Sequence, residues 1–319
     1  MGSNPAPFVL QQQLTALAIA YKNNQLIADQ ILPRVPVVAQ TFKYTVFNKV
    51  DNFSVVDDRV GRTSAPQQID WSATEDESST QDHALDQPVP YADVQAAQSV
   101  QAVTGVMPVD PEAIATQQLS DVILINREKR VADMVFASGS YDSNNVEVLS
   151  GTSQWSDFTN SNPINDILAA LDQVIVRPNT FLLGQAVWTK LRQHPKVVQA
   201  IYGTAATSGV VTKEQVAALL EIQNLIVGQG WLNTAKKGQA LSLARVWGKH
   251  ASLLYINPLA ISTKDLTFGI TAQWGQRIAG STPDSKIGMR GGTMVRVGES
   301  VKELVVANDV GYFFENAVA

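Results

Sequence analysis

The chain has 319 residues, room for two ordinary domains, and its 45% hydrophobic and 17% charged residues are typical of an ordered globular protein. Cysteine is absent, which excludes disulfides, thiol nucleophiles and cysteine metal sites and fits assembly in a reducing cytoplasm. The net charge is −5, and residues 63–126 hold ten acidic side chains without one Lys or Arg. Tight DNA binding through that stretch is therefore disfavoured.

The N-terminal segment predicts a helix followed by extended chain. Residues 8–31 carry apolar side chains at helical spacing, namely Leu10, Leu14, Leu17 and Tyr21. Pro33 and Pro36 then require extended backbone. The apolar run 14–20 is too short to span a bilayer, and no basic region precedes it, so we expect no membrane partner.

A β-rich segment, residues 42–50, is followed by a long polar region that reaches about Asp82. A loop of this length is unusual inside a compact domain, so we expect an arm that lies on another surface. Glu75, Asp76 and Glu77 lack the alternate spacing and the glycine of a calcium loop. We interpret them as a solvated or partner-facing acidic surface.

A long helix is predicted over residues 110–136. Asp110 can cap its start, Pro111 suits the first turn, and Glu112 lies near the positive end of the helix dipole. At ~1.5 Å per residue the helix would be a rod of roughly 40 Å. One side is expected to be lined by Ile114, Val122, Ile125 and Met134.

The middle of the chain predicts a compact mixture of helices and strands. After a loop over residues 141–162, helices are expected over 164–174, 178–195 and 211–221. Two apolar strands, 224–233 and 243–256, follow, with the polar loop 234–240 between them.

The C-terminal part predicts more strands, over residues 268–274, 294–298 and 301–307. Residues 278–283 are expected to form a turn. The apolar tail over 311–317 is expected to pack against the body of the protein rather than fray.

Nothing in the sequence predicts a catalytic, cofactor-binding or metal site. The three histidines, His83, His194 and His250, have no spacing that suggests shared ligation. The pair Gly228 and Gly230 follows an apolar strand, but the third glycine of a dinucleotide fingerprint is missing and another strand follows. Neither a phosphate-binding loop nor a nucleophile elbow is present.

Six tryptophans are expected to anchor the core; they are Trp71, Trp155, Trp188, Trp231, Trp247 and Trp274. A stacking platform for nucleic acid would need neighbouring cations. Trp247 does have Arg245 and Lys249 at alternate positions, but these two cations alone are a weak indication.

Several segments, in this order, resemble phage major capsid proteins of the HK97-like fold. Residues 26–37 resemble the N-terminal arm that ends in prolines, with Lys43-Tyr44 after it, and residues 83–90 resemble the returning strand of the extended loop. Residues 110–136 resemble the spine helix, and residues 178–258 resemble the axial domain. The order of the segments carries the resemblance, because no single motif is diagnostic.

The resemblance implies an α+β fold with five parts. These are an N-terminal arm (1–40), an extended β-hairpin loop (41–94), a peripheral domain (95–177) with a spine helix at about 111–136, an axial domain (178–258), and return strands of the peripheral domain with the C-terminus (259–319). Some family members begin with a scaffold segment, whereas this arm begins near Met1. Scaffolding would then be cleaved from the chain or supplied separately.

The resemblance implies a head protein and not an enzyme. Its hexamers and pentamers would form the icosahedral shell of the virion. The shell would enclose double-stranded DNA without recognising its sequence. The shell would assemble in the bacterial cytoplasm, with scaffolding, portal and decoration proteins as further candidate partners. The alternatives are an encapsulin-like bacterial compartment and an α+β hydrolase with a dispersed active site.

Neighbouring subunits are expected to meet through the N-terminal arm and the extended loop. The acidic loop would face cations of a neighbour, either Lys190, Arg192 and Lys196 or Arg127, Lys129 and Arg130. Some family members crosslink through Lys and Asn, for which Lys43, Lys49 and Asn308 would be candidates here. We expect plain non-covalent assembly.

Overall fold

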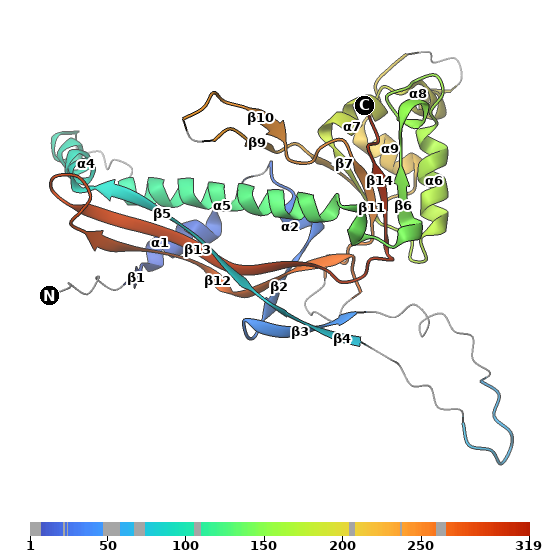
Figure 1. Cartoon of the computed structure of the whole chain (residues 1–319), viewed down its shortest axis with the longest axis horizontal. Coiled ribbons are helices and arrows are strands. Elements are labelled where there is room, and N and C mark those ends of the chain that lie inside the picture. Colours follow the sequence, from blue (N-terminus) through green and yellow to red (C-terminus); the bar gives the residue numbers. More distant parts are fainter. Residues whose placement is uncertain are drawn as a thin grey trace.

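The computed structural model describes residues 8–21, 23, 25–46, 58–66, 74–104, 110–203, 208–236, 238–259 and 266–319. Figure 1 shows an elongated molecule in which a long helix and a twisted sheet run together along the long axis. A compact group of helices and strands lies at one end, and another helix lies at the opposite end. Among the described helices, none combines the length and apolar character needed to cross a bilayer.

The long helix is α5, Pro111–Val135, which confirms the predicted rod. The Asp110 carboxylate caps its start by accepting a hydrogen bond from the Glu112 amide at 3.1 Å. The predicted apolar side is wrong, because Ile114 and Val122 are exposed. The buried face packs against α1 and the sheet and is formed by residues that include Ala115, Leu119, Ile123, Val131 and Val135.

The twisted sheet combines both ends of the chain. Its strand order is β1-β12-β13-β5, with β2 also paired to β12. The strands are β1 (Val9–Leu10), β2 (Arg34–Val37), β5 (Gln81–Pro90), β12 (Gly269–Asp284) and β13 (Gly292–Val305). The segment 83–90, which resembles the returning strand of the extended loop, lies in β5 and pairs antiparallel with β13.

The strand boundaries predicted near the C-terminus are wrong. Residues 278–283 continue β12 instead of turning, and β13 spans both of the strands expected over 294–307. A bulge between Trp274 and Ile278 interrupts the pairing, and Gly275 there has a φ of 69°, which glycine adopts without steric cost. The glycine and polar residues at the bulge resemble a turn in sequence, but the long pairing partner keeps the strand going.

The N-terminal arm contains two helices rather than the single predicted one. They are α1 (Gln12–Ala20) and α2 (Ala28–Ile31). Between them the Asn23 side chain accepts from the Gln25 amide at 3.1 Å, and the Leu26 amide donates to the Asn23 carbonyl. Asparagine favours such local bonds over helical ones, which explains the break.

The compact end is built around a five-stranded sheet of order β6-β14-β11-β7-β8. Its strands are β6 (Val146–Val148), β7 (Thr180–Gly184), β8 (Asn224–Gly228), β11 (Ala251–Leu254) and β14 (Gly311–Glu315). Its helices are α6 (Pro163–Gln173), α7 (Gln185–Leu191), α8 (Pro195–Tyr202) and α9 (Lys213–Leu219). Short 3-10 turns precede them at Ser138–Ser140, Ser143–Asn145 and Gly151–Ser153.

The helix predicted over residues 178–195 is wrong in its first half, which is strand β7. Every residue of β7 is buried, so its apolar run carries no alternation that would distinguish a strand from a helix. The predictions for α6 and α9 are confirmed, and Thr212 and Gln215 form a capping box at the start of α9.

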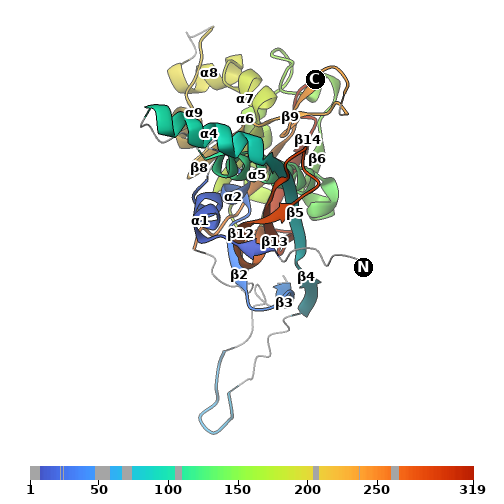
Figure 2. The ribbon, with the colours of Figure 1, turned by 90° about the vertical axis from the view of Figure 1, so that its left-hand side faces the viewer.

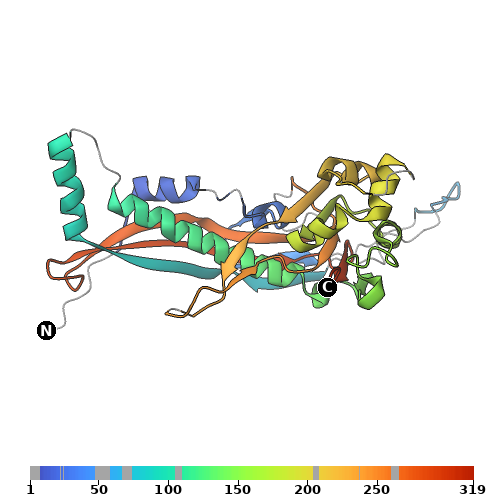
Figure 3. The ribbon, with the colours of Figure 1, turned by 90° about the horizontal axis from the view of Figure 1, so that it is seen from above.

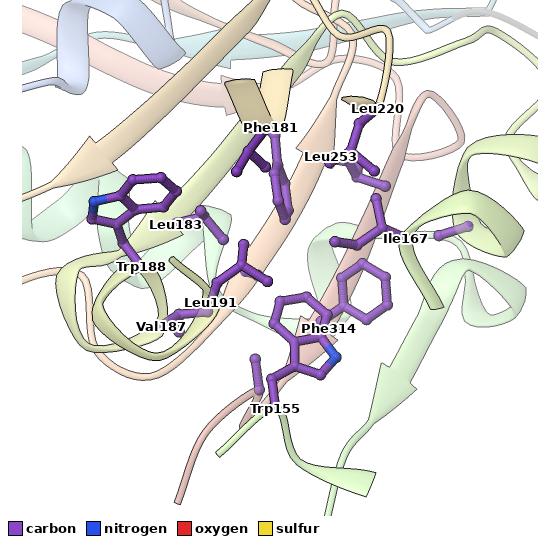
Figure 4. Packing of buried hydrophobic residues seen from close by; sticks show 14 of the residues in the cluster. Trp155, Ile167, Phe181, Leu183, Val187, Trp188, Leu191, Leu220, Leu253 and Phe314 are labelled. Atoms are coloured by element: carbon purple, nitrogen blue, oxygen red, sulfur yellow. The ribbon is translucent and has the colours of Figure 1, made fainter. Parts of the chain in front are cut away.

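Aromatic and branched side chains from these elements form one core, shown in Figure 4. Trp155 lies against Phe314 with ring centroids 5.2 Å apart, and Phe181 packs edge-on to the same indole. Phe313 and Phe314 on β14 are fully buried, which confirms that the C-terminal tail is packed.

Two ribbons of two strands each stand apart from these sheets. One joins β3 (Thr41–Val46) to β4 (Thr74–Ser79), and the other joins β9 (Trp231–Asn233) to β10 (Leu243–Arg245). Each strand predicted over residues 224–256 is therefore divided in two. Helix α4, Tyr91–Thr104, lies at the far end from α6–α9, as Figure 3 shows from above.

Candidate assembly surfaces

One buried carboxylate of the spine helix holds the N-terminal arm. Glu128 accepts hydrogen bonds from the backbone amides of Ile27 at 3.0 Å and Ala28 at 2.7 Å. The Trp247 indole donates to the same carboxylate at 2.5 Å. Burial raises the pKa of Glu128, and the three donors oppose that rise. The Glu128 side chain thus joins α5 to two segments that are distant in sequence, the arm at residues 27–28 and the loop that carries Trp247.

Beside this carboxylate, ion pairs tie the arm to the helix and the sheet. Buried Arg127 contacts Asp29 at 2.6 Å, and Arg34 and Arg277 each contact Glu299 at 3.0 Å. Burial disfavours the charged forms of Asp29 and Glu299, but the arginines outweigh it and hold both pKa values below their ordinary range. The arm segment around α2 is therefore bound firmly to its own subunit.

A hollow of about 1040 Å³ opens between the arm and the spine helix, and these ion pairs line part of it. The pKa values of its ion-paired carboxylates, Asp29 and Glu299, are lowered, whereas Glu128, whose pKa is raised by burial, is held by three hydrogen-bond donors. Within the described residues no group of three His, Asp or Glu side chains could hold a metal ion. The ion pairs that line this hollow join the arm to the helix and the sheet.

The predicted cationic contacts fall into two classes. Arg127 is buried in its own subunit, so it cannot face a neighbour. Arg130 pairs with Glu303 of the same subunit at 2.9 Å. Lys129 pairs with Asp133 on the same helix. In the other set, Lys196 donates to the Ser161 carbonyl at 2.6 Å. Lys190 on α7 and Arg192 at its C-cap are exposed.

The acidic residues Glu75, Asp76 and Glu77 lie together on β4 and are exposed. Lys43 on β3 reaches Glu75 at 3.7 Å, and the Tyr44 hydroxyl donates to Asp76 at 3.4 Å. As crosslinking candidates, Lys43 and Asn308 are both exposed, whereas Lys49 lies outside the described residues. The crosslink remains untested.

The β9–β10 ribbon carries a surface that the sequence reasoning missed. Trp231 is 47% exposed, and the Arg245 guanidinium stacks on its ring at 3.7 Å. Leu243 on the same ribbon is also exposed. A charge count could have drawn attention to it, because residues 222–264 contain five Lys or Arg and no acid.

Three of the tryptophans, Trp155, Trp188 and Trp247, are buried as predicted. Trp231 and Trp274 are not, since each exposes more than two fifths of its surface. Trp71 lies outside the described residues.

The histidines serve the fold and do not meet. His194 is buried and caps α8 through a hydrogen bond from the Lys196 amide to its Nδ1. The Nδ1 atom of His250 accepts from the Asn316 amide, and His83 lies on β5.

Gly228 allows close packing rather than binding a nucleotide. A Cβ at this position would lie 2.2 Å from the Trp247 ring, so only glycine fits beneath the indole. This contact explains the glycine at the end of β8.

Comparisons with known proteins match the chain almost from end to end. A family model described as phage major capsid protein E matches residues 112–233. A major capsid protein of Pseudomonas phage JBD67 is 49% identical over 314 residues, which are 98% of this chain and 99% of that protein. A solved phage-related protein from Bordetella bronchiseptica aligns over 98% of both chains, with a TM-score of 0.76 and 22% identity. The capsid of cyanophage P-SCSP1u aligns over 93% of this chain and 89% of its own, with a TM-score of 0.55 and 10% identity.

Proposed function

Because this chain belongs to the phage major capsid proteins, we propose that its copies form hexamers and pentamers of a closed icosahedral shell around double-stranded DNA. The observation that carries the proposal is the 49% identity with a phage major capsid protein over nearly the whole chain. The HK97-like α+β fold expected from the sequence is confirmed by the likeness to solved capsid proteins. As a capsid protein the chain is part of the virion.

The five-part division into arm (1–40), extended loop (41–94), peripheral domain (95–177), axial domain (178–258) and return strands (259–319) is part of this proposal. The compact end with α6–α9 and its five-stranded sheet supports an axial domain, and α5 with the long sheet supports a peripheral domain. The ribbons β3–β4 and β9–β10 then extend from this body toward neighbouring subunits.

The role we propose is geometric rather than catalytic. Surfaces that differ within one subunit, such as an acidic ribbon and a basic one, can repeat around a closed ring. A shell of chains with net charge −5 would enclose DNA without binding its phosphates tightly. Tight binding of the phosphates would hinder packaging and release of the DNA. Assembly in the host cytoplasm, and contacts with scaffolding, portal and decoration proteins, belong to the same proposal.

Electron microscopy of the purified chain tests the shell. We expect uniform closed particles, whereas small discrete oligomers in every buffer would contradict the proposal. Nuclease treatment of virions tests the content. Protected double-stranded DNA is expected, and particles that hold only protein cargo would point to a bacterial compartment.

A further inference from the structure

Charge is divided between the two ribbons that project from the body. Three of the ten acids in the cation-free stretch 63–126 lie on β4, and Arg245 lies on β10 within residues 222–264, which have five cations and no acid. The five cations are Lys236, Lys237, Arg245, Lys249 and Lys264. Opposite charges of this kind attract when the two surfaces can approach each other.

The two ribbons do not meet within one chain. In Figures 1 and 2, β3–β4 lies below the long sheet, and β9–β10 lies on the other side, above α5. The body of the subunit stands between them. A contact between these surfaces therefore requires a second copy of the chain.

The β9–β10 ribbon has the composition of a binding surface. Arg245 lies directly opposite Trp231 in the register, and Leu243 shares their face because it lies two residues before Arg245. Leu232, on the opposite face, packs toward the core. An exposed tryptophan stacked with arginine is typical of residues that dominate interface energetics.

The β3–β4 ribbon offers a complementary surface. Glu75, Asp76 and Glu77 are consecutive, so their carboxylates line both faces of β4 at its exposed edge. Within the described residues β4 pairs only with β3, and a two-stranded ribbon is marginally stable by itself. Contact with another subunit would stabilise it.

We propose that the β9–β10 ribbon of one subunit docks on β4 of the next copy, with Trp231 and Arg245 against the carboxylates of Glu75 to Glu77. The inference rests on the proposed shell function and names one contact within its rings. Because the two surfaces are different, each copy uses one on either side, and the contact repeats until the ring closes.

Charge exchange tests the contact. Arg245→Glu, or Glu75→Lys combined with Glu77→Lys, should each lower the fraction of chain in closed shells by about tenfold at low salt. Combining all three substitutions in one chain should restore most of that fraction. Co-expression of the two variant chains should restore six-membered rings, in which the two variants can alternate, but each five-membered ring would keep one contact between like charges.

Arg192→Glu is the matched control, since Arg192 is an exposed arginine at the C-cap of α7 on the compact end. It should leave shell formation unchanged. Circular dichroism on each soluble variant separates loss of contact from loss of fold. The inference is overturned if Arg245→Glu assembles as the wild type does, if Arg192→Glu is the variant that fails, or if the exchange restores nothing. Wild-type chain that forms no shells would instead overturn the proposed function itself.

Discussion

The indole nitrogen of Trp247 donates to the Glu128 carboxylate at 2.5 Å, across a sequence distance of more than a hundred residues. The same carboxylate accepts the amides of Ile27 and Ala28, so it joins the spine helix to the arm and to the loop before β11. This relationship is structural, and it predicts where the fold is most sensitive.

Replacing Glu128 with Ala should lower the free energy of unfolding by at least about 3 kcal/mol, because three buried N–H groups lose their acceptor. Glu128→Gln should cost about 2 kcal/mol, since one oxygen becomes a donor that faces other donors. Urea unfolding of the unassembled chain, followed by far-ultraviolet circular dichroism, measures both. The matched control is Glu112→Gln on the first turn of the same helix, which should change stability by under about 1 kcal/mol. Equal effects at the two positions would refute the prediction.

The glycine beneath the indole gives a second prediction. Gly228→Ala places a Cβ about 2.2 Å from the Trp247 ring, so the indole must move and its bond to Glu128 must break. We expect a loss of about 3 kcal/mol in unfolding free energy. Gly139→Ala is the control, because no atom lies within 4 Å of the added Cβ there. If Gly228→Ala unfolds at the wild-type urea concentration, the packing described here is wrong.

Local signals in the sequence were enough to predict α5, α6 and α9. Asp110 and Thr212 cap two of these helices, and their apolar spacing is regular. Such signals depend only on residues a few positions apart. Such local signals indicate that a helix exists, but they do not determine which face of the helix is buried. For this reason Ile114 is predicted on the buried face of α5 although it is exposed.

The elements that were predicted wrongly depend on partners far away in the chain. Strand β7 pairs with other strands at both edges and packs against a separate core on each face, and β12 continues past Gly275 because β13 pairs with it on both sides of the bulge. Arg127 was expected on a surface because its partner Asp29 is 98 positions away. The contact between Trp231 and Arg245 depends on the pairing register of β9 and β10. The periodicity of the sequence does not predict that register.

The pairing of Arg127 with Asp29 gives a third prediction. Arg127→Met should reduce the free energy of unfolding by about 1–3 kcal/mol, because buried Glu303 loses a cation while Asp29, which is more than half exposed, keeps Arg34 as a partner. Lys129→Met, two residues further along the helix, removes an exposed i,i+4 pair and should cost about 0.5 kcal/mol or less. Urea unfolding measures both variants.

A double-mutant cycle checks that the effect comes from this pair. Asp29→Asn combined with Arg127→Met should cost less than the sum of the two single substitutions, because the second removes an interaction already lost. Strict additivity would show that Arg127 acts through its other contacts, such as the Thr271 hydroxyl, and not through Asp29.

The buried His194 predicts loss of stability in acid. Burial, with the nearby Lys196 ammonium, lowers the pKa of His194 to about 4, against an ordinary value of 6.5. The unfolded chain therefore binds a proton at a higher pH than the folded chain. The contribution of His194 is complete above pH ~6.5, falls as the pH drops toward ~4, and amounts to about 3 kcal/mol.

The hydrogen bonds give the physical reason for this loss. The Lys196 amide donates to Nδ1, which places the proton of the neutral ring on Nε2, within 3.1 Å of the Ser161 hydroxyl. A second proton would have to displace the Lys196 amide from Nδ1 and uncap α8. His194→Asn keeps an acceptor at the cap but cannot titrate, so its unfolding free energy should change less between pH 7 and pH 4.5. His83→Asn, at a half-exposed position, should retain the wild-type dependence more closely. The same acid dependence in His194→Asn and in the wild type would place the responsible group elsewhere.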